Sequence, residues 1–248
     1  SWTTFQKMSG AGGVKGAGDT MERTFLPLTF WFCRNPGLAL PLIALQYHEV
    51  KVIVTFNSVS ACGGNTTFGS AQLWADYIYL DTDERRRFAQ VSHEYLIEQV
   101  QFTNSSTTST SHDLNFNHPV KELIWTGGVT TSGPDATTGP STPILLASGP
   151  YKVVLNGHDR FAERDLKYFT RAQVWQHHNG HGSVNVVDSI AVYSFALKPE
   201  EHQPSGTCNF SRIDNAQLKC PSDALYIYAV NYNVLRIMSG MGGLAYSN

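Results

Sequence analysis

The sequence predicts an all-β fold, a β-sandwich or jelly roll, with a β-barrel as the alternative. Three observations support this: many short β-prone segments are separated by turn residues, the connecting loops are long and polar, and helical patterns are almost absent. The chain has 248 residues, of which 42% are hydrophobic and 15% charged, so it contains enough apolar material for a sizeable core.

The first clear strand pattern lies at residues 50–56. Val50, Val52, Val54 and Phe56 alternate with polar residues, which is typical of a strand with one face on a core. Aromatic and β-branched residues favour further strands at residues 74–80, 95–102, 120–126, 151–155, 173–176, 184–197 and 225–238.

Turn and helix signals divide these segments. Asn156-Gly157 predicts a hairpin turn, and Asn179-Gly180 marks another turn, because Asn and Gly tolerate a positive φ. Residues 81–90 predict one short helix with Asp81 or Thr82 as its N-cap. Residues 103–112 and 130–143 are rich in Ser, Thr, Gly or Pro, so both are predicted to be exposed loops.

Composition argues against several functional classes. The formal net charge is −2, which argues against a basic surface that grips nucleic acid directly. The longest apolar run, residues 37–45, contains Pro41 and is too short to span a membrane, and residues 1–20 resemble no signal peptide. The four cysteines favour free thiols, with a Cys208–Cys220 bridge left open.

The cluster His177, His178 and His181 is the one candidate metal site. Adjacent histidines in a strand face opposite sides, and His181 follows a turn, so an exposed turn or subunit contact is favoured over a metal site. Two charged runs, at residues 83–87 and 159–167, are predicted to be solvated surface. No catalytic or cofactor motif is present, so we expect neither an enzyme nor a cofactor.

Three N-x-[ST] sequons, at Asn65, Asn104 and Asn209, are candidate glycosylation sites. Such motifs are short and common by chance, so ordinary polar loop residues are the favoured interpretation.

Six blocks of sequence resemble a known family: FWFCRNPGLALPLIALQYHEV (30–50), ADYIYLDTDERRRFAQVSHEYLIEQVQF (75–102), LNFNHP (114–119), NGHDRFA (156–162), YSFALKPEEHQPSGTCNFSRIDN (193–215) and YAVNYNVLRIMSGMGGLAYSN (228–248). Together they closely resemble the major capsid proteins of nucleocytoplasmic large DNA viruses, most of all those of algal viruses (phycodnaviruses) and also iridoviruses. The blocks occur in the family's order, and they match the C-terminal part of its chain.

The resemblance implies a double jelly roll. Residues 1–80 would form the closing strands of a first jelly roll that lacks its N-terminal part, 81–91 a connector, and 92–248 a second, C-terminal jelly roll. The apolar segment at residues 34–45 would suit a packed corner or a subunit contact.

The resemblance also implies a structural molecule of the virion, made late in infection and assembled in the host cytoplasm. Homotrimers would form pseudo-hexagonal capsomers that tile an icosahedral shell. Neighbouring capsomers and minor capsid proteins would be the partners, and proximity to an internal membrane under the shell stays open. Two alternatives are a glycan-binding jelly-roll module for host attachment and a cupin-type metal enzyme built on the three histidines.

Overall fold

The computed structural model describes residues 25–55, 70–104, 108–127, 146–179, 188–223 and 225–246. These residues fall into two compact units. The first holds the residues up to Tyr95 together with Arg236–Gly243, and the second holds those from Leu96 to Leu235 together with residues 244–246. Each unit is described by itself.

Three short 3-10 helices begin the described part of the first unit: η1 (Trp31–Cys33), η2 (Pro36–Leu38) and η3 (Leu42–Ala44). The side chain of Asn35 caps η2 by accepting a hydrogen bond from the Gly37 N–H at 2.9 Å. Ala44 and Leu45 are buried. Proline recurs in this segment and prevents it from continuing as one regular helix or strand.

Helix α2 (Thr82–Gln90) confirms the one helix predicted from sequence. The carboxylate of Asp81 accepts the Glu84 N–H at 2.8 Å, and Asp83 and Glu84 place negative charge at the positive end of the helix dipole. The helix ends before Val91, where the chain becomes extended.

The strands predicted at residues 50–56 and 74–80 are absent. Within the described residues 50–55 and 70–80, no segment pairs with a neighbouring strand, and Phe56 lies outside the described part. A β-prone pattern becomes a strand only when another segment completes its hydrogen bonds.

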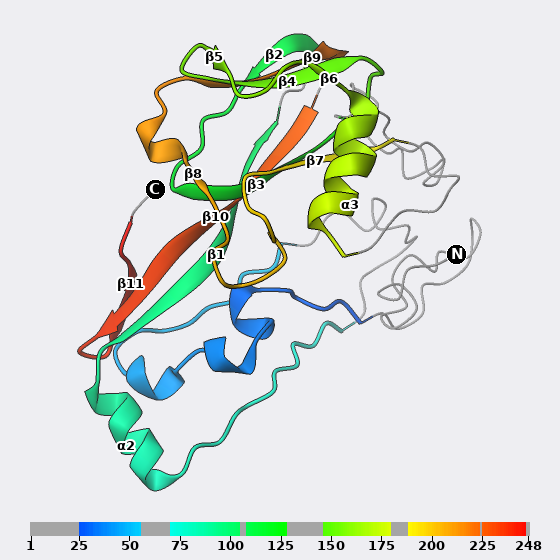
Figure 1. The fold of residues 1–248 in the computed structure, drawn as a ribbon. Coiled ribbons are helices and arrows are strands. Elements are labelled where there is room, and N and C mark those ends of the chain that lie inside the picture. Colours follow the sequence, from blue (N-terminus) through cyan, green and yellow to red (C-terminus); the bar gives the residue numbers. More distant parts are fainter. Residues whose placement is uncertain are drawn as a thin grey trace. The chain divides into compact units, whose positions relative to one another are not determined.

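The remaining strands form two antiparallel sheets (Figure 1). In the first sheet the order is β1 (His93–Asn104), β10 (Leu225–Met238), β3 (Pro119–Gly127) and β7 (Ile190–Ser194). The short strand β11 (Met241–Leu244) pairs with β10, and β8 (Cys208–Asn209) pairs with β3.

In the second sheet the order is β2 (Ser109–Asp113), β9 (Ala216–Asp223), β4 (Pro150–Leu155) and β5 (His158–Asp159), with β6 (Arg164–Asp165) also paired to β4. The long strands alternate between the sheets along the chain, and the first pairs with the last long strand, which is the arrangement of a jelly roll. The predicted all-β jelly-roll sandwich is therefore confirmed.

The core of the second unit fills the space between these sheets. Trp125 on β3, Tyr151 on β4 and Phe169 have no exposed surface, and the Trp125 and Phe169 rings lie 5.2 Å apart. Smaller buried residues complete the layer, including Val120, Leu123, Val153, Ala191, Leu218, Leu225, Ile227 and Ala229.

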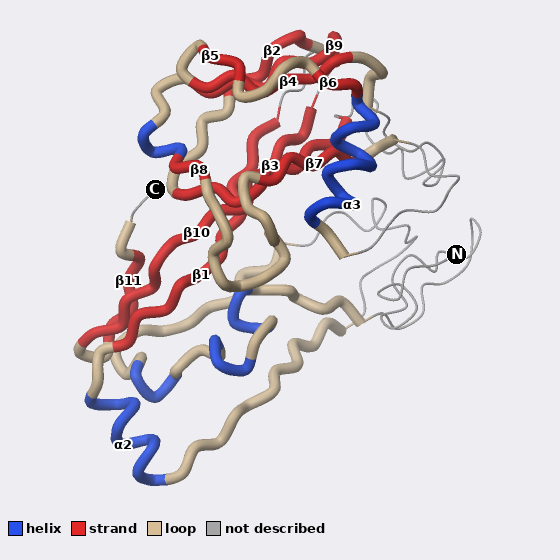
Figure 2. Tube along the Cα trace, viewed as in Figure 1, coloured by secondary structure: helices blue, strands red, loops and turns tan. Residues whose placement is uncertain are grey.

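A helical segment lies beside β7 (Figure 2). It consists of the π-helical η5 (Tyr168–Ala172) and the short helix α3 (Gln173–His177), so the strand predicted at residues 173–176 is wrong. The buried Gln173 side chain explains the position, since its amide oxygen accepts the Ser194 N–H of β7 at 3.1 Å.

Three further predictions have mixed outcomes. The Asn156-Gly157 turn is confirmed, with positive φ angles of 50° and 80° between β4 and β5. The strand predicted at residues 184–197 is limited to β7, and residues 184–187 lie outside the described part. The loop predicted at residues 103–112 is shorter, because β1 and β2 extend into it, while residues 105–107 lie outside the described part.

A fourth 3-10 helix among the described residues, η6 (Phe210–Arg212), follows β8 and places Phe210 in the core. Among the helices of the described residues, none is long and apolar enough to cross a membrane.

A β-bulge interrupts strand β3. Val230 of β10 pairs with Glu122, and the next residue, Asn231, pairs with Val120, so Lys121 has no pairing partner on β10. The bulge lets Lys121 and Glu122 lie on the same face of the sheet, opposite the face that carries Leu123 and the core. Both are almost fully buried, at 2% and 7% exposed.

Candidate functional site

The bulge in β3 collects charged side chains on a buried surface. Lys121 Nζ lies 2.7 Å from Glu98 Oε1 of β1, and these side chains are 2% and 7% exposed. The Lys121 ammonium also lies 5.4 Å from the centre of the Tyr232 ring on β10. Burial, followed by the carboxylates of Glu98 and Glu122, raises the pKa of Tyr232 to about 12.

The neighbouring Glu122 faces a histidine. His178 Nε2 lies 3.0 Å from Glu122 Oε2, and His178 Nδ1 lies 3.1 Å from Glu200 Oε1. The first contact is an ion pair without hydrogen-bond geometry, and the second is a hydrogen bond. Glu122 first, and then Glu200, raise the pKa of His178, although burial opposes them.

The structure separates two of the three histidines that formed the candidate metal site. His177 Nδ1 hydrogen-bonds to the carbonyl oxygen of Leu197, whereas His178 contacts the two glutamates. His181 lies outside the described residues. Among the described residues, no group of three or more His, Cys, Asp or Glu side chains could hold a metal ion.

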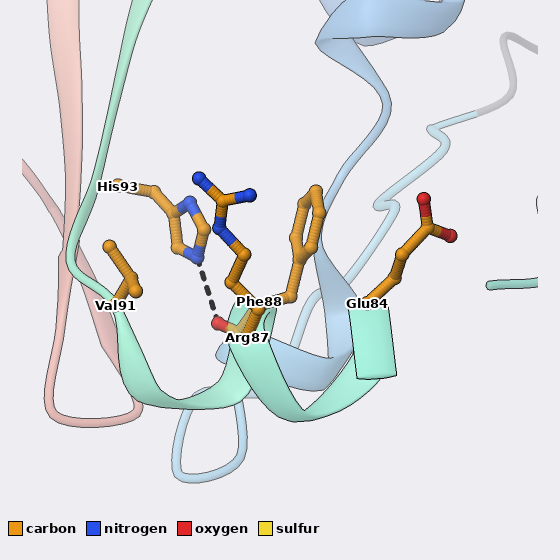
Figure 3. Close-up of a pocket in the computed structure, with 5 residues that line it drawn as sticks. All are labelled: Glu84, Arg87, Phe88, Val91 and His93. Carbon is orange, nitrogen blue, oxygen red and sulfur yellow. Dashed lines mark hydrogen bonds between the residues drawn. The ribbon is translucent and has the colours of Figure 1, made fainter. Parts of the chain in front are cut away.

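A shallow pocket of about 300 Å³ lies in the first unit, between helix α2 and the start of β1. Glu84, Arg87, Phe88, Val91 and His93 line it, and Figure 3 shows Glu84 and His93 at opposite ends of this group. His93 Nε2 donates to the Phe88 carbonyl oxygen at 2.8 Å, and the two rings stack at 5.1 Å. The imidazole thus fixes the end of the helix and the start of the strand.

The two charged runs form exposed contacts, as expected from sequence. Lys152 Nζ lies 3.1 Å from Asp159 and 3.3 Å from Glu163, and these two carboxylates raise the pKa of Lys152. In α2 the Arg86–Asp83 pair is loose, at 3.8 Å, and largely solvated. Such pairs add little to stability.

The candidate glycosylation sites differ in their surroundings. Asn104 is exposed at the end of β1, and Asn65 lies outside the described residues. Asn209 caps η6 by accepting the Ser211 N–H at 3.1 Å. Glycosylation of these asparagines stays a prediction.

The Cys208–Cys220 bridge left open by the sequence does not form. Burial raises the pKa of the Cys208 thiol. Cys33 is exposed, and Cys62 lies outside the described residues.

The first unit exposes large apolar side chains along its two unpaired segments. Ile53 is 85% exposed, Trp74 75% and Tyr79 92%, and several neighbours share this exposure: Val50, Val52, Val54, Leu73, Tyr77 and Ile78. Clustered apolar surface of this kind can be covered by further parts of the same protein or by a neighbouring molecule. The sequence predicted strands at residues 50–56 and 74–80, but it did not predict that these side chains would be exposed.

The buried charges on β3 were missed as a site. A signal was present, because Lys121 and Glu122 are adjacent charged residues inside an otherwise apolar strand. Their partners Glu98, His178 and Glu200 are far away in sequence, and no spacing rule links them.

Two family models match the chain. Residues 84–243 match the large eukaryotic DNA virus major capsid protein, and residues 6–81 match the major capsid protein N-terminus. Among curated proteins, the major capsid protein of Pyramimonas orientalis virus is 54% identical over 94% of this chain, and that of Paramecium bursaria Chlorella virus 1 is 44% identical over 92%. The chain spans 63% and 67% of the lengths of these two relatives.

A solved structure supports the same relationship. The crystal structure of PBCV-1 VP54, fitted into a reconstruction of the virophage Sputnik, superposes with a TM-score of 0.70 at 41% identity. The match covers 91% of this chain and 71% of that one. The family model, the two relatives and this fold agree, and the chain therefore belongs to the family of major capsid proteins of large eukaryotic DNA viruses.

Proposed function

We propose that the protein containing this chain is a structural protein of the virion, which builds the outer shell of a large DNA virus. The observation that carries this proposal is the family match over residues 84–243 together with the jelly-roll fold of those residues. A chain from a quasi-atomic model of the PBCV-1 virus capsid also superposes on this chain, with a TM-score of 0.69 at 40% identity. No catalytic step belongs to this role.

The proposed mechanism is assembly by symmetric burial of complementary surfaces. Three copies would form a capsomer of pseudo-hexagonal outline, and capsomers would tile an icosahedral shell with minor capsid proteins as further neighbours. Assembly would take place in the host cytoplasm, with no direct nucleic-acid contact. Obligate interfaces have apolar centres with aromatic anchors, and the low charge and 12% aromatic content of the chain suit such a role.

The proposed domain division follows the same relationship. Residues 1–80 would close a first jelly roll, 81–91 would connect, and 92–248 would form the second. Helix α2, with its N-cap at Asp81, supports a connector at this position. Limited proteolysis of the full-length protein would test the division, with cleavage expected near α2 before either jelly roll is cut.

The mass of the full-length protein in solution tests the assembly role. Light scattering after size exclusion is expected to give three copies at micromolar concentration. A well-folded monomer under these conditions would contradict obligate trimerisation.

A further inference from the structure

Three side chains from separate segments meet at the C-terminal end of helix α3. His178 follows the helix, Glu122 lies on β3, and Glu200 lies in the segment after β7. The histidine ring lies between the two carboxylates, with one ring nitrogen 3.0 Å and the other 3.1 Å from a carboxylate oxygen.

This arrangement selects one protonation state of the histidine. A neutral imidazole has one N–H donor and one lone pair, whereas an ionised carboxylate only accepts. If Nδ1 donates to Glu200, an unprotonated Nε2 would leave its lone pair within 3.0 Å of the Glu122 carboxylate. Only the imidazolium places positive charge beside both carboxylates.

The burial of Glu122 makes the protonation state of His178 important for stability. The Glu122 side chain is 9% exposed, and its Oε2 atom is buried with no partner in hydrogen-bond geometry, so the nearby His178 charge is what compensates it. A buried carboxylate without a compensating charge is strongly unfavourable.

We propose that His178, Glu122 and Glu200 form a proton-dependent clasp that holds the end of helix α3 on strand β3 and opens as the pH rises. The clasp includes backbone contacts on the same side: Asn179 N–H donates to Glu200 Oε1 at 3.0 Å, and His178 N–H donates to the Val174 carbonyl oxygen at 2.9 Å. Opening would therefore release the last turn of the helix together with the segment that carries Glu200.

The cations on the surrounding elements that could compensate Glu122 in place of His178 are bound to other carboxylates. On β3, Lys121 binds Glu98, and after β7, Lys198 binds Glu201 at 3.0 Å. Further titratable groups on these elements are Tyr232 of β10, whose pKa of about 12 keeps it neutral, and His177, which contacts the Leu197 carbonyl oxygen. Burial raises the pKa of Tyr193 on β7, and Tyr168 of η5 accepts a hydrogen bond from Gln173. Arg171 of η5 is paired with Asp188 at 3.3 Å, and His202 lies in the segment after β7.

The direction of the pH effect follows from the raised pKa of His178. A histidine whose pKa is higher in the folded state stabilises that state fully below its ordinary value of 6.5. This stabilisation is lost as the pH rises through the raised pKa. The clasp is thus closed in mild acid and opens on the alkaline side.

Hydrogen exchange on the full-length protein tests the proposal between pH 5 and pH 9. Exchange at the histidine ring carbon, followed by mass spectrometry, reports the titration of each histidine, and His178 is expected to titrate above 6.5. Amide exchange in residues 173–179, corrected for the intrinsic effect of pH, is expected to speed up about tenfold for each pKa unit of the shift.

His178→Gln should abolish this pH-dependent loss of protection, whereas His177→Gln is the matched control and should retain it. Glu200→Gln, at a position 38% exposed, is a milder change that should lower the pH at which His178 titrates. The proposal is overturned if His178 titrates at or below 6.5, or if the wild type and both histidine variants lose protection equally.

Discussion

The buried ion pair between Lys121 and Glu98 offers a direct test of how the charged face of β3 contributes to stability. At 2.7 Å and an effective dielectric constant of about 20, two unit charges attract by about 6 kcal/mol. Much of this attraction offsets the loss of hydration, since both side chains are nearly inaccessible to water.

Removing either Lys121 or Glu98 alone should therefore lower the free energy of unfolding strongly, whereas replacing both should change it little. We expect Lys121→Met to lower the free energy of unfolding by about 3–5 kcal/mol, because Glu98 stays buried without its cation. The double variant Lys121→Met/Glu98→Leu should lie within about 1 kcal/mol of the wild type or above it, since apolar side chains of similar volume carry no hydration penalty.

The assay is urea denaturation of the full-length protein at one fixed concentration, followed by tryptophan fluorescence and circular dichroism, because the proposed assembly would make apparent stability concentration-dependent. The matched control is the exposed pair Lys198–Glu201, at 3.0 Å with side chains 67% and 58% exposed. Its double-mutant cycle should give a coupling below about 1 kcal/mol. A coupling equally small for Lys121–Glu98 would refute the reasoning from burial.

Four further substitutions have defined outcomes. Asn156→Ala should cost about 2–4 kcal/mol in urea denaturation, because its side-chain oxygen accepts two backbone N–H groups at 3.0 and 3.1 Å and its φ is +50°; a loss below about 1 kcal/mol contradicts this. Gly206→Ala should cost about 1–3 kcal/mol, since a Cβ there would lie 2.8 Å from a backbone oxygen at a φ of +143°. Gly157→Ala, with open space around it, should cost less, and equal losses would argue against the steric cause. Asp188→Asn should lower the thermal midpoint at neutral pH, because the hydrogen bond from Thr170 lowers the pKa of Asp188. The difference from wild type should disappear as the pH falls from 3.8 through that lowered value, and a difference that persists in acid would exclude this carboxylate as the cause.

The jelly roll of the second unit could be predicted from sequence because its signals are local. The run at residues 225–238 is long and β-prone, and it forms β10 with the same bounds. Asn156-Gly157 forms the predicted turn. Asp81 caps α2 by accepting a hydrogen bond from the N–H of Glu84, which is only three residues later in the sequence.

Predictions failed where the outcome depends on distant partners. Residues 173–176 were predicted to form a short strand, because a run of four residues is too short to distinguish the periodicity of a helix from that of a strand. In the structure the backbone of β7 binds the Gln173 side chain and holds this segment in place. Residues 74–80 are β-prone, but pairing requires another strand, which the described part of the chain does not provide. The contact of His178 with Glu122 could not be predicted for the same reason: the two residues are 56 positions apart, and a bulge determines which face Glu122 occupies.

The bulge on β3 also favours one alignment of β3 with β10. If β3 shifted by one residue against β10, Lys121 and Glu122 would move to the opposite face, among Trp125 and its apolar neighbours. Two unpaired charges in that layer would be prohibitively unfavourable, whereas an apolar strand could slide at little cost. The adjacent charges thus strongly disfavour a misaligned pairing of β3 with β10.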